Sequence, residues 1–279
     1  MGKLYVVATP IGNLEDITLR ALRVLREVPL IAAEDTRKTG KLLAHHEIDT
    51  PMISCFEHNE VARVDYFLSR LARGDVALVS DAGTPGISDP GYRLITAAIE
   101  AGIEVVPVPG PSAVITALSI SGLPTDRALF IGFLPRKATQ RREALTAVAK
   151  EPHTLVAFET PHRLLRSLAD IHDVLGDRRI VVGRELTKLY EEVVRGRVSE
   201  LITQFSENVP RGEFTLVIEG ATCELTGWPE PRVREAFAEL LREGLRRRKA
   251  AKQVASESGW STREVYDLRY ELREEEVHE

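Results

Sequence analysis

The sequence predicts an α/β protein with two α/β domains followed by a small helical domain. Three observations support this prediction. Short apolar runs alternate with amphipathic stretches through residue 219, a Pro-Gly-Pro sequence at 109–111 interrupts the alternation, and beyond residue 231 the composition becomes charged and purely helical. Prolines and glycines mark such boundaries, so the expected domains are residues 1–111, 112–224 and 230–279.

The first domain is expected to contain a parallel sheet covered by helices on both faces, because near-continuous apolar strands that alternate with helices are typical of such sheets. Leucines at helical spacing, Leu19, Leu22 and Leu25, support the first helix. The expected strands are Leu4–Ala8, Leu30–Ala33, Val76–Ser80 and Ile103–Val108, and the expected helices are Asp16–Val28, Val61–Arg73 and Pro90–Ala101.

The second domain repeats the alternation of strands and helices, but its pattern does not predict the order of the strands. Ser112 is expected to be the N-cap of the first helix, because a serine hydroxyl accepts a hydrogen bond from the first helical turn. The expected helices are Ser112–Ser121, Arg141–Lys150 and His162–Val174, and the expected strands are Leu129–Phe133, Thr154–Phe158, Ile180–Val182 and Phe214–Glu219.

The C-terminal domain has the residue spacing of a helix-turn-helix. Ala255, Gly259 and Val265 correspond to a small residue, a turn glycine and an apolar residue on the second helix. Arg242, Arg246 and Lys249 lie at helical spacing and are expected to share one face. Two interpretations remain open: an appendage that contacts nucleic acid, or a solvated helical hairpin that packs on the core or on a partner subunit.

Composition and charge exclude several classes of protein. Hydrophobic residues make up 43% of the chain and charged residues 28%, which is typical of a globular protein. The net charge of −5 argues against nonspecific coating of nucleic acid, although a local basic face remains compatible with it. Two cysteines give neither a disulfide framework nor metal-binding spacing. The sequence shows no signal peptide and no apolar run of about 18 residues, so we expect a cytoplasmic protein that does not enter the membrane and binds no metal.

Three loops rich in glycine and proline follow predicted strands, at residues 9–13, 81–91 and 107–113. In open parallel sheets, ligands bind beyond the carboxyl ends of the strands. The loops contain neither the G-x-x-x-x-G-K-[ST] nor the G-x-G-x-x-G phosphate-binding sequence. A ligand with adenine and amino-acid ends but no phosphates suits them better. The alternative is three tight turns that bind no ligand.

These loops and several other segments resemble one protein family, that of ribosomal RNA small subunit methyltransferase I within the tetrapyrrole methylase superfamily. The resemblance extends from about Lys3 to Gly220, and the C-terminal helices resemble the family's extra domain less strictly. The segments that carry it are residues 4–16, Ala33-Glu34-Asp35-Thr36-Arg37, residues 80–91, Pro109-Gly110-Pro111-Ser112-Ala113, residues 158–163 and Gly183-Arg184-Glu185-Leu186-Thr187-Lys188.

This resemblance implies a homodimer with a tetrapyrrole methylase-like (class III methyltransferase) fold, which binds S-adenosylmethionine in the cleft between two α/β domains. It implies methylation of the ribose 2′-hydroxyl of a cytidine in the decoding region of 16S rRNA. The cofactor-binding residues that it implies are Pro10, Gly12, Asp81, Ala82, Gly83, Thr84, Ser112, Ala113, Leu186 and Phe214.

The catalytic hypothesis from the sequence is Lys188 together with Asp35. A ribose hydroxyl is a poor nucleophile, so a base or a cation that favours the alkoxide should help. A lysine acts as a base only if burial or a neighbouring cation lowers its pKa; Lys188 and Arg37 could instead hold phosphates. The mouth of the cleft is expected to be lined by Arg136, Lys137, Arg141 and Arg142. The predicted RNA-binding residues are Arg37, His58, Arg136, Lys137, Arg246 and Arg247.

Three other functions are compatible with parts of the sequence. One is a methyltransferase of the same superfamily that acts on a corrin or porphyrin precursor. Another is a regulator that senses S-adenosylmethionine and binds DNA through its C-terminal helices. A nicotinamide-dependent dehydrogenase is disfavoured because the pyrophosphate-binding fingerprint is missing.

Overall fold

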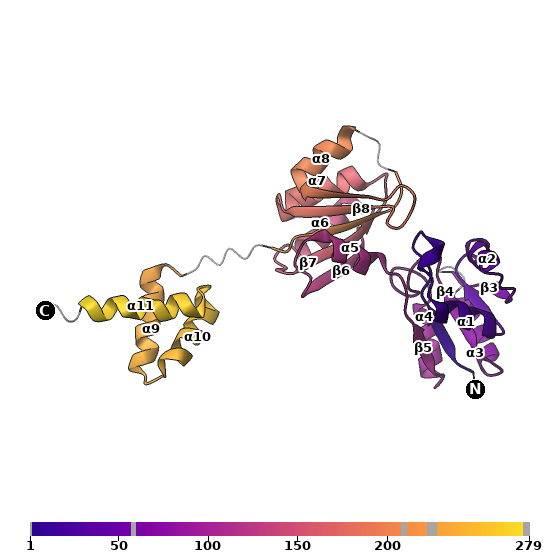
Figure 1. Cartoon of the computed structure of the whole chain (residues 1–279), viewed down its shortest axis with the longest axis horizontal. Helices are drawn as coiled ribbons and strands as arrows, with labels where there is room; N and C mark the ends of the chain where they lie inside the picture. The colour runs from indigo at the N-terminus through magenta and orange to yellow at the C-terminus, as the bar shows by residue number, and fades with distance from the viewer. Residues whose placement is uncertain (1, 57–59, 208–210, 222–227, 276–279) are drawn as a thin grey trace. The chain divides into compact units, whose positions relative to one another are not determined.

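The structure is a computed structural model that describes residues 2–56, 60–207, 211–221 and 228–275. It divides into two compact units, which we call the α/β unit (Met1–Gly220) and the helical unit (Ala221–Glu279) (Figure 1). The predicted α/β domains, residues 1–111 and 112–224, fall in the α/β unit except for residues 221–224. Their boundaries, including the separation at residues 111–112, remain a prediction.

The first half of the α/β unit contains a five-stranded sheet in which every pairing is parallel. The strand order is β3-β2-β4-β1-β5. The strands are β1 (Leu4–Val7), β2 (Ile31–Ala33), β3 (Met52–Ser54), β4 (Val76–Val79) and β5 (Val105–Val108). The parallel sheet that we predicted is therefore confirmed, with β3 added at one edge.

Helices cover both faces of this sheet, as the side chains of β2 demonstrate. Ile31 and Ala33 belong to one apolar cluster, with Leu25, whereas Ala32 belongs to another, with Phe67. Alternate residues of a strand point to opposite faces, so both faces are buried. The helices are α1 (Leu19–Glu27), α2 (Thr36–His45), α3 (Glu60–Leu71) and α4 (Tyr92–Glu100), with a short 3-10 helix at Leu14–Asp16.

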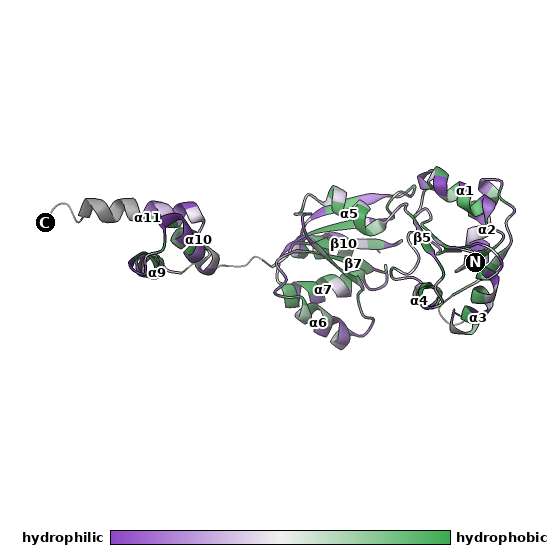
Figure 2. Cartoon of the chain, turned by 90° about the horizontal axis from the view of Figure 1, so that it is seen from below, coloured by the Kyte–Doolittle hydropathy of each residue, from purple (hydrophilic) through white to green (hydrophobic). Residues whose placement is uncertain are grey.

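The second half contains a mixed sheet in the order β6-β7-β10-β8-β9. Only the pairing of β6 with β7 is parallel; the other three pairings are antiparallel. The strands are β6 (Ala128–Phe133), β7 (Thr154–Glu159), β8 (Arg179–Arg184), β9 (Glu192–Arg197) and β10 (Phe214–Ile218). The apolar side chains of β7 and β10 give these central strands the green colour in Figure 2.

Helices also cover both faces of the second sheet. The helix α5 (Ala113–Ser121) packs over one face, where Ala117 and Leu118 join a cluster with Val156 and Val217. The other face is covered by α6 (Ala138–Ala147), α7 (Leu164–Leu175) and α8 (Val198–Glu207). The α/β class that we predicted for this half is confirmed.

The helical unit has its own small core, formed by α9 (Glu230–Arg242), α10 (Arg247–Ser258) and α11 (Thr262–Glu275). Gly259 ends α10 with a φ of 75°, which fits the turn glycine that we predicted. The expectation that Arg242, Arg246 and Lys249 share one helical face is wrong. Because α9 ends at Arg242 and Gly244 has a φ of +87°, a turn separates Arg242 from the other two.

Across the described ranges, none of the helices combines the length and the apolar character that crossing a membrane requires.

Candidate active site

A cavity of about 320 Å³ lies in the α/β unit and receives side chains from both of its halves. Its size is typical of a small-molecule site. The first half contributes Ile11 and residues 82–84 and 87–89; the second contributes residues 112–114, Phe133, residues 158–161, Gly183, Glu185, Leu186, Lys188 and residues 213–215.

The loop that follows β4 forms one wall, and backbone hydrogen bonds fix its shape. Gly83 has a φ of +77°, a conformation that glycine adopts without strain. The Thr9 amide donates to the Gly83 carbonyl over 2.9 Å, and the Gly83 amide donates to the Thr9 carbonyl over 3.0 Å. The loops after β1 and β4 therefore hold each other at the carboxyl edge of the sheet.

The far end of the same loop is held by Glu60, a buried carboxylate on α3. Its Oε1 accepts hydrogen bonds from the amides of Gly91, Arg93 and Leu94 at 2.9–3.1 Å. Gly91 is the N-cap of α4 but has no side chain that could accept these donors. Glu60 thus caps α4 from a neighbouring helix and fixes the point where the loop ends.

The opposite wall includes the first turn of α5 and the strained segment 185–188. Ser112 caps α5 by accepting from the Ile115 amide over 3.5 Å, as the sequence predicted. Glu185 and Thr187 have φ values of 49° and 67°, which are uncommon for residues other than glycine. The Thr187 hydroxyl accepts from the Asn13 amide over 3.1 Å, so this segment is joined to the loop after β1.

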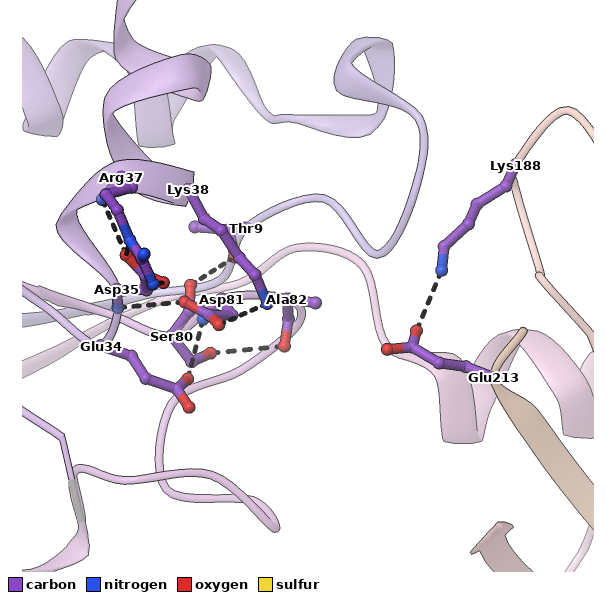
Figure 3. A network of polar contacts seen from close by, with 10 residues as sticks. All are labelled: Thr9, Glu34, Asp35, Arg37, Lys38, Ser80, Asp81, Ala82, Lys188 and Glu213. Carbon is purple, nitrogen blue, oxygen red and sulfur yellow. Dashed lines mark hydrogen bonds and ion pairs between the residues drawn. The ribbon is translucent and has the colours of Figure 1, made fainter. Parts of the chain in front are cut away.

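A polar network joins the ends of β2 and β4 beside the cavity (Figure 3). The Asp81 carboxylate accepts from the Asp35 amide over 3.1 Å and from the Lys38 ammonium over 2.7 Å. In return, the Asp81 amide donates to Glu34 over 3.0 Å. Burial raises the pKa of Glu34, while the hydrogen bond from the Asp81 amide acts in the opposite direction.

Asp89 is a carboxyl that lines the cavity and has a strongly raised pKa. Burial raises its pKa to about 7, and the neighbouring charges of Glu34, Asp81 and Glu213 act in the same direction, against a hydrogen bond with Ser80 that lowers it. A carboxyl with this pKa can accept a proton near neutral pH. Our sequence analysis did not select Asp89, although it lies in the loop at 81–91 that drew attention.

Lys188 lines the cavity between two carboxylates. Its Nζ lies 2.9 Å from Glu185 Oε1 and 3.0 Å from Glu213 Oε2, and Figure 3 shows it pointing toward Glu213. Burial alone would lower the pKa of Lys188, but the hydrogen bonds to these carboxylates raise it above its ordinary value. The geometry therefore favours a permanent cation over the base of our catalytic hypothesis.

Asp35, the other half of that hypothesis, lies outside the residues that line the cavity. Its carboxylate pairs with Arg37, with Oδ2 2.7 Å from Nη2, and it is the N-cap of α2. The hydrogen bond from Arg37 holds the pKa of Asp35 well below its usual range. A carboxylate in this state is a weak base, so its role as a proton acceptor is also disfavoured.

The predicted cofactor residues occupy three places. Pro10 and Asp81 line a second pocket with Lys38. Gly12 packs against the 186–188 segment, where an added Cβ would lie 2.4 Å from Lys188 Cγ, so a close approach explains this glycine. The cavity itself is lined by Ala82, Gly83, Thr84, Ser112, Ala113, Leu186 and Phe214.

The predicted RNA-binding residues occupy different places. Arg37 has 88% of its side chain exposed, and Arg136 and Lys137 are exposed just before α6. His58 lies outside the described residues. Arg246 and Arg247 belong to the helical unit.

The expectation that Arg141 guides RNA is wrong, because its guanidinium is buried. Arg141 is only 3% exposed, and its Nε donates to Asp170 over 2.7 Å. The more exposed Arg142 pairs with the other oxygen of the same carboxylate at 2.6 Å. Both arginines thus join α6 to α7.

The residues of the cavity suit a cation that carries no phosphates. Of the described residues that line it, Lys188 alone is cationic, and two carboxylates already neutralise it. Asp89, Glu185 and Glu213 give the walls negative charge, while Ile11, Leu186 and the aromatic rings of Phe133 and Phe158 supply apolar surface. A sulfonium with adenine and amino-acid ends fits this set of groups.

Comparison with known proteins places this fold in one class. The family model for Tetrapyrrole (Corrin/Porphyrin) Methylases matches residues 3–202. The structure of the methyltransferase CobJ covers 79% of this chain and 95% of its own, with a TM-score of 0.61 and 16% identity. Uroporphyrin-III-C-methyltransferase from Thermus thermophilus gives a TM-score of 0.55, with 22% identity over 78% of this chain and 94% of its own. The protein is thus a tetrapyrrole methylase by fold, a class that uses S-adenosylmethionine.

Within this class, the chain belongs to the ribosomal RNA small subunit methyltransferase I family. The Synechocystis protein of that name is 50% identical over 275 residues, covering 98% of this chain and 99% of its own. The Thermotoga maritima protein of that name is 51% identical over 221 residues, which cover 79% of this chain and 99% of its own. The expected family, fold and cofactor are confirmed.

Proposed function

We propose that this chain transfers a methyl group from S-adenosylmethionine to the ribose 2′-hydroxyl of a cytidine in the decoding region of 16S rRNA. The observation that carries the proposal is the 50% identity to a ribosomal RNA small subunit methyltransferase I over nearly the whole of both chains. The solved corrin and porphyrin methyltransferases share the fold at 16–22% identity, which says nothing about the acceptor.

The cavity would bind the donor through backbone groups and apolar surface. The residues that would hold it include Ala82, Gly83, Thr84, Ser112, Ala113, Leu186 and Phe214, all of which line the cavity. When bound, the donor supplies an electrophilic methyl group on a positively charged sulfur. The protein's main contribution is to position the acceptor hydroxyl against this carbon and exclude water.

Asp89 would accept the proton that the hydroxyl loses. It lines the cavity, and its pKa of about 7 keeps it ready to take up a proton at neutral pH. Lys188 would stay protonated and stabilise negative charge that develops on the acceptor oxygen. This assignment replaces Lys188 as the base, and it keeps the cationic role that the sequence analysis left open.

We further propose a homodimer that works in the cytoplasm, where small ribosomal subunits are found. Both follow from the family resemblance. Analytical ultracentrifugation of the full chain tests the first, since a monomer at micromolar concentration would contradict it.

Methyl transfer to undermethylated small ribosomal subunits tests the proposed activity. Radiolabel from S-adenosylmethionine should appear in 16S rRNA, at one cytidine, as an alkali-stable 2′-O-methyl group. Free rRNA and duplex DNA serve as alternative acceptors, and uroporphyrinogen tests the small-molecule reaction. Labelling of the tetrapyrrole but not of the subunits would refute the proposal.

A further inference from the structure

The helix α10 carries basic side chains on the side opposite its packed face. Successive residues turn by about 100° around an α-helix. Ala250, Ala251 and Val254 are buried in the core of the helical unit, and Arg247 lies on the same side. On the opposite side lie Arg248, Lys249 and Lys252, all exposed, and together with the exposed N-cap Arg246 they form what we call the basic face.

Arg247 does not belong to the basic face, because it joins α10 to α11. Its guanidinium lies 3.9 Å from the centre of the Tyr266 ring, and Nη2 donates to the Tyr266 carbonyl over 3.1 Å. This stacking fixes the rotation of α10 about its own axis. The basic face is therefore held outward by a specific contact.

The placement of charge on α10 is unfavourable for the helix alone. Cations near an N-terminus and anions near a C-terminus oppose the helix dipole. The basic face occupies the N-cap and the first turns of α10, with no acidic residue in the first turn, whereas Glu257 lies in the last turn. Within the part of the chain that the structure describes, no carboxylate pairs with Arg246, Arg248, Lys249 or Lys252. Arg248 and Lys252, four residues apart, repel each other.

An anionic partner would remove both unfavourable effects. The N-cap, Arg246, makes no side-chain capping bond, so the first turn lacks the acceptor that a capping serine or aspartate provides. Phosphates bind well at such helix ends, and arginine and lysine supply the charge. A local rule broken without internal compensation is a mark of a functional surface.

The second helix of the motif does not carry this charge. On α11, Arg263 lies 3.8 Å from Asp267, and Glu264 accepts from the Ser261 amide to cap the helix. A DNA-binding helix-turn-helix presents its second helix to the bases of the major groove. Here the positive charge lies on the first helix, which favours contact with a phosphate backbone over base recognition.

We propose that the basic face of α10 binds the phosphate backbone of the RNA that contains the acceptor nucleotide. The proposal rests on the proposed function for the identity of that RNA. The helical unit then increases affinity without taking part in the chemistry. The Thermotoga maritima relative supports this division of roles between the two units. The 221 residues that match make up 99% of that protein, so it has no room for a further unit as large as the helical unit.

The test compares two double variants of the full chain that each remove two positive charges. In Arg248→Ala/Lys252→Ala the basic face is weakened. In the control, Arg23→Ala/Arg263→Ala, both arginines are exposed and have an acidic neighbour four residues on. Binding of a 16S rRNA fragment with the decoding region is measured at several salt concentrations, and single-turnover methyl transfer to small subunits is measured at saturating subunit concentration.

The basic-face variant should bind the fragment about tenfold more weakly than the control, with the slope of log K against log salt reduced by about 1.5. Its saturated methyl-transfer rate should equal that of the wild type. Its helical unit should unfold at the same or a higher temperature, because repulsion has been removed. Equal affinities and equal salt slopes for the two variants would overturn the proposal. If the wild type transfers no methyl group but the binding contrast remains, the proposed function fails while the RNA contact stands.

Discussion

At the scale of single residues, the site depends on how its surroundings raise the pKa values of two cavity residues, Asp89 and Lys188. Burial and nearby carboxylates raise the pKa of Asp89 to about 7. Glu185 and Glu213 hold Lys188 protonated. One group is thus available to accept a proton, and the other keeps its positive charge throughout the neutral range.

The pH dependence of methyl transfer tests the role of Asp89. A base must be deprotonated to act, so the single-turnover rate of the wild type should rise about tenfold per pH unit below pH 7 and level off above it. Asp89→Asn should lower the plateau by a factor of about 100 to 10,000 and abolish this rise. Calorimetric titration with S-adenosylmethionine is the control for an intact site. A variant that keeps the wild-type pH profile would assign the proton to another group.

Asp89 should also make the protein less stable as the pH rises. Its folded pKa of about 7 lies above the ordinary value of about 3.9. The folded state therefore binds the additional proton between pH 4 and 7, and the free energy of unfolding falls as the pH increases through that range. Asp89→Asn should match the wild type at pH 4 and exceed it by about 1–2 kcal/mol at pH 8, after allowance for solvent screening. Urea denaturation at pH 4 and pH 8 measures the free energy of unfolding of the variant and the wild type. If the two proteins differed by the same amount at both pH values, the raised pKa would be contradicted.

Sequence patterns predicted the loops of this site better than its chemistry. Glycines, prolines and strand ends identified the loop at 81–91 and the turn before α5, because those signals are local. The raised pKa of Lys188 depends on Glu185, three residues away, and also on Glu213, which is 25 residues away in the chain and is brought near by the pairing of β10 with β8. That pairing has no local signature, so the contribution of Glu213 could not be predicted from the sequence.

At the scale of elements, Glu60 connects α3 to the start of α4 and thereby to the cavity loop. In Glu60→Ala the amides of Gly91, Arg93 and Leu94 lose their acceptor. Loss of a buried cap should lower the free energy of unfolding by about 2 kcal/mol or more. The affinity for S-adenosylmethionine should fall as well, because the loop loses its fixed end. Glu100→Ala, at an exposed position on α4, is the matched control, and equal stability of the two variants would exclude the capping role.

The pair of α6 and α7 offers a second test, because one aspartate holds two arginines of different exposure. Arg141 is buried with Asp170, whereas 57% of the Arg142 side chain is exposed. Arg141→Ala leaves a buried carboxylate with one remaining partner and should cost about 3–5 kcal/mol. Arg142→Ala should cost about 1 kcal/mol or less. Denaturant titration of both variants measures the two losses of unfolding free energy. Similar losses would mean that the burial of Arg141 does not make its ion pair more important than that of Arg142.

Three of the elements that the sequence failed to predict share a physical cause. The strands β3 and β9 lie at sheet edges and are half-buried, so they lack the apolar runs that identified the central strands. The helix α2 begins with Thr36-Arg37-Lys38-Thr39-Gly40-Lys41, which shows no apolar stripe. Its N-cap, Asp35, was instead interpreted as a catalytic residue. Tertiary packing determined these elements more than local preference did.

At the scale of the whole molecule, the chain combines two units with separate cores. The clusters of the α/β unit contain no residue beyond Ile218, and the cluster of the helical unit begins at Trp228. The sequence indicates a similar division through its change of composition near residue 230, because a helical unit with its own core needs a different periodicity. Stability should therefore divide between the units.

A chain that ends at residue 221 should fold and retain the cofactor site. Of the residues that the structure describes, those that line the cavity lie between 11 and 215, all within the α/β unit. Calorimetric affinity for S-adenosylmethionine and the saturated single-turnover rate should both stay within about twofold of the full chain. The concentration of small subunits that gives half the maximal rate should rise about tenfold, because the RNA contacts of α10 are lost. A truncated chain that binds the donor normally but has a much lower saturated rate would show that the helical unit acts in the chemical step, contrary to the division of roles proposed for it.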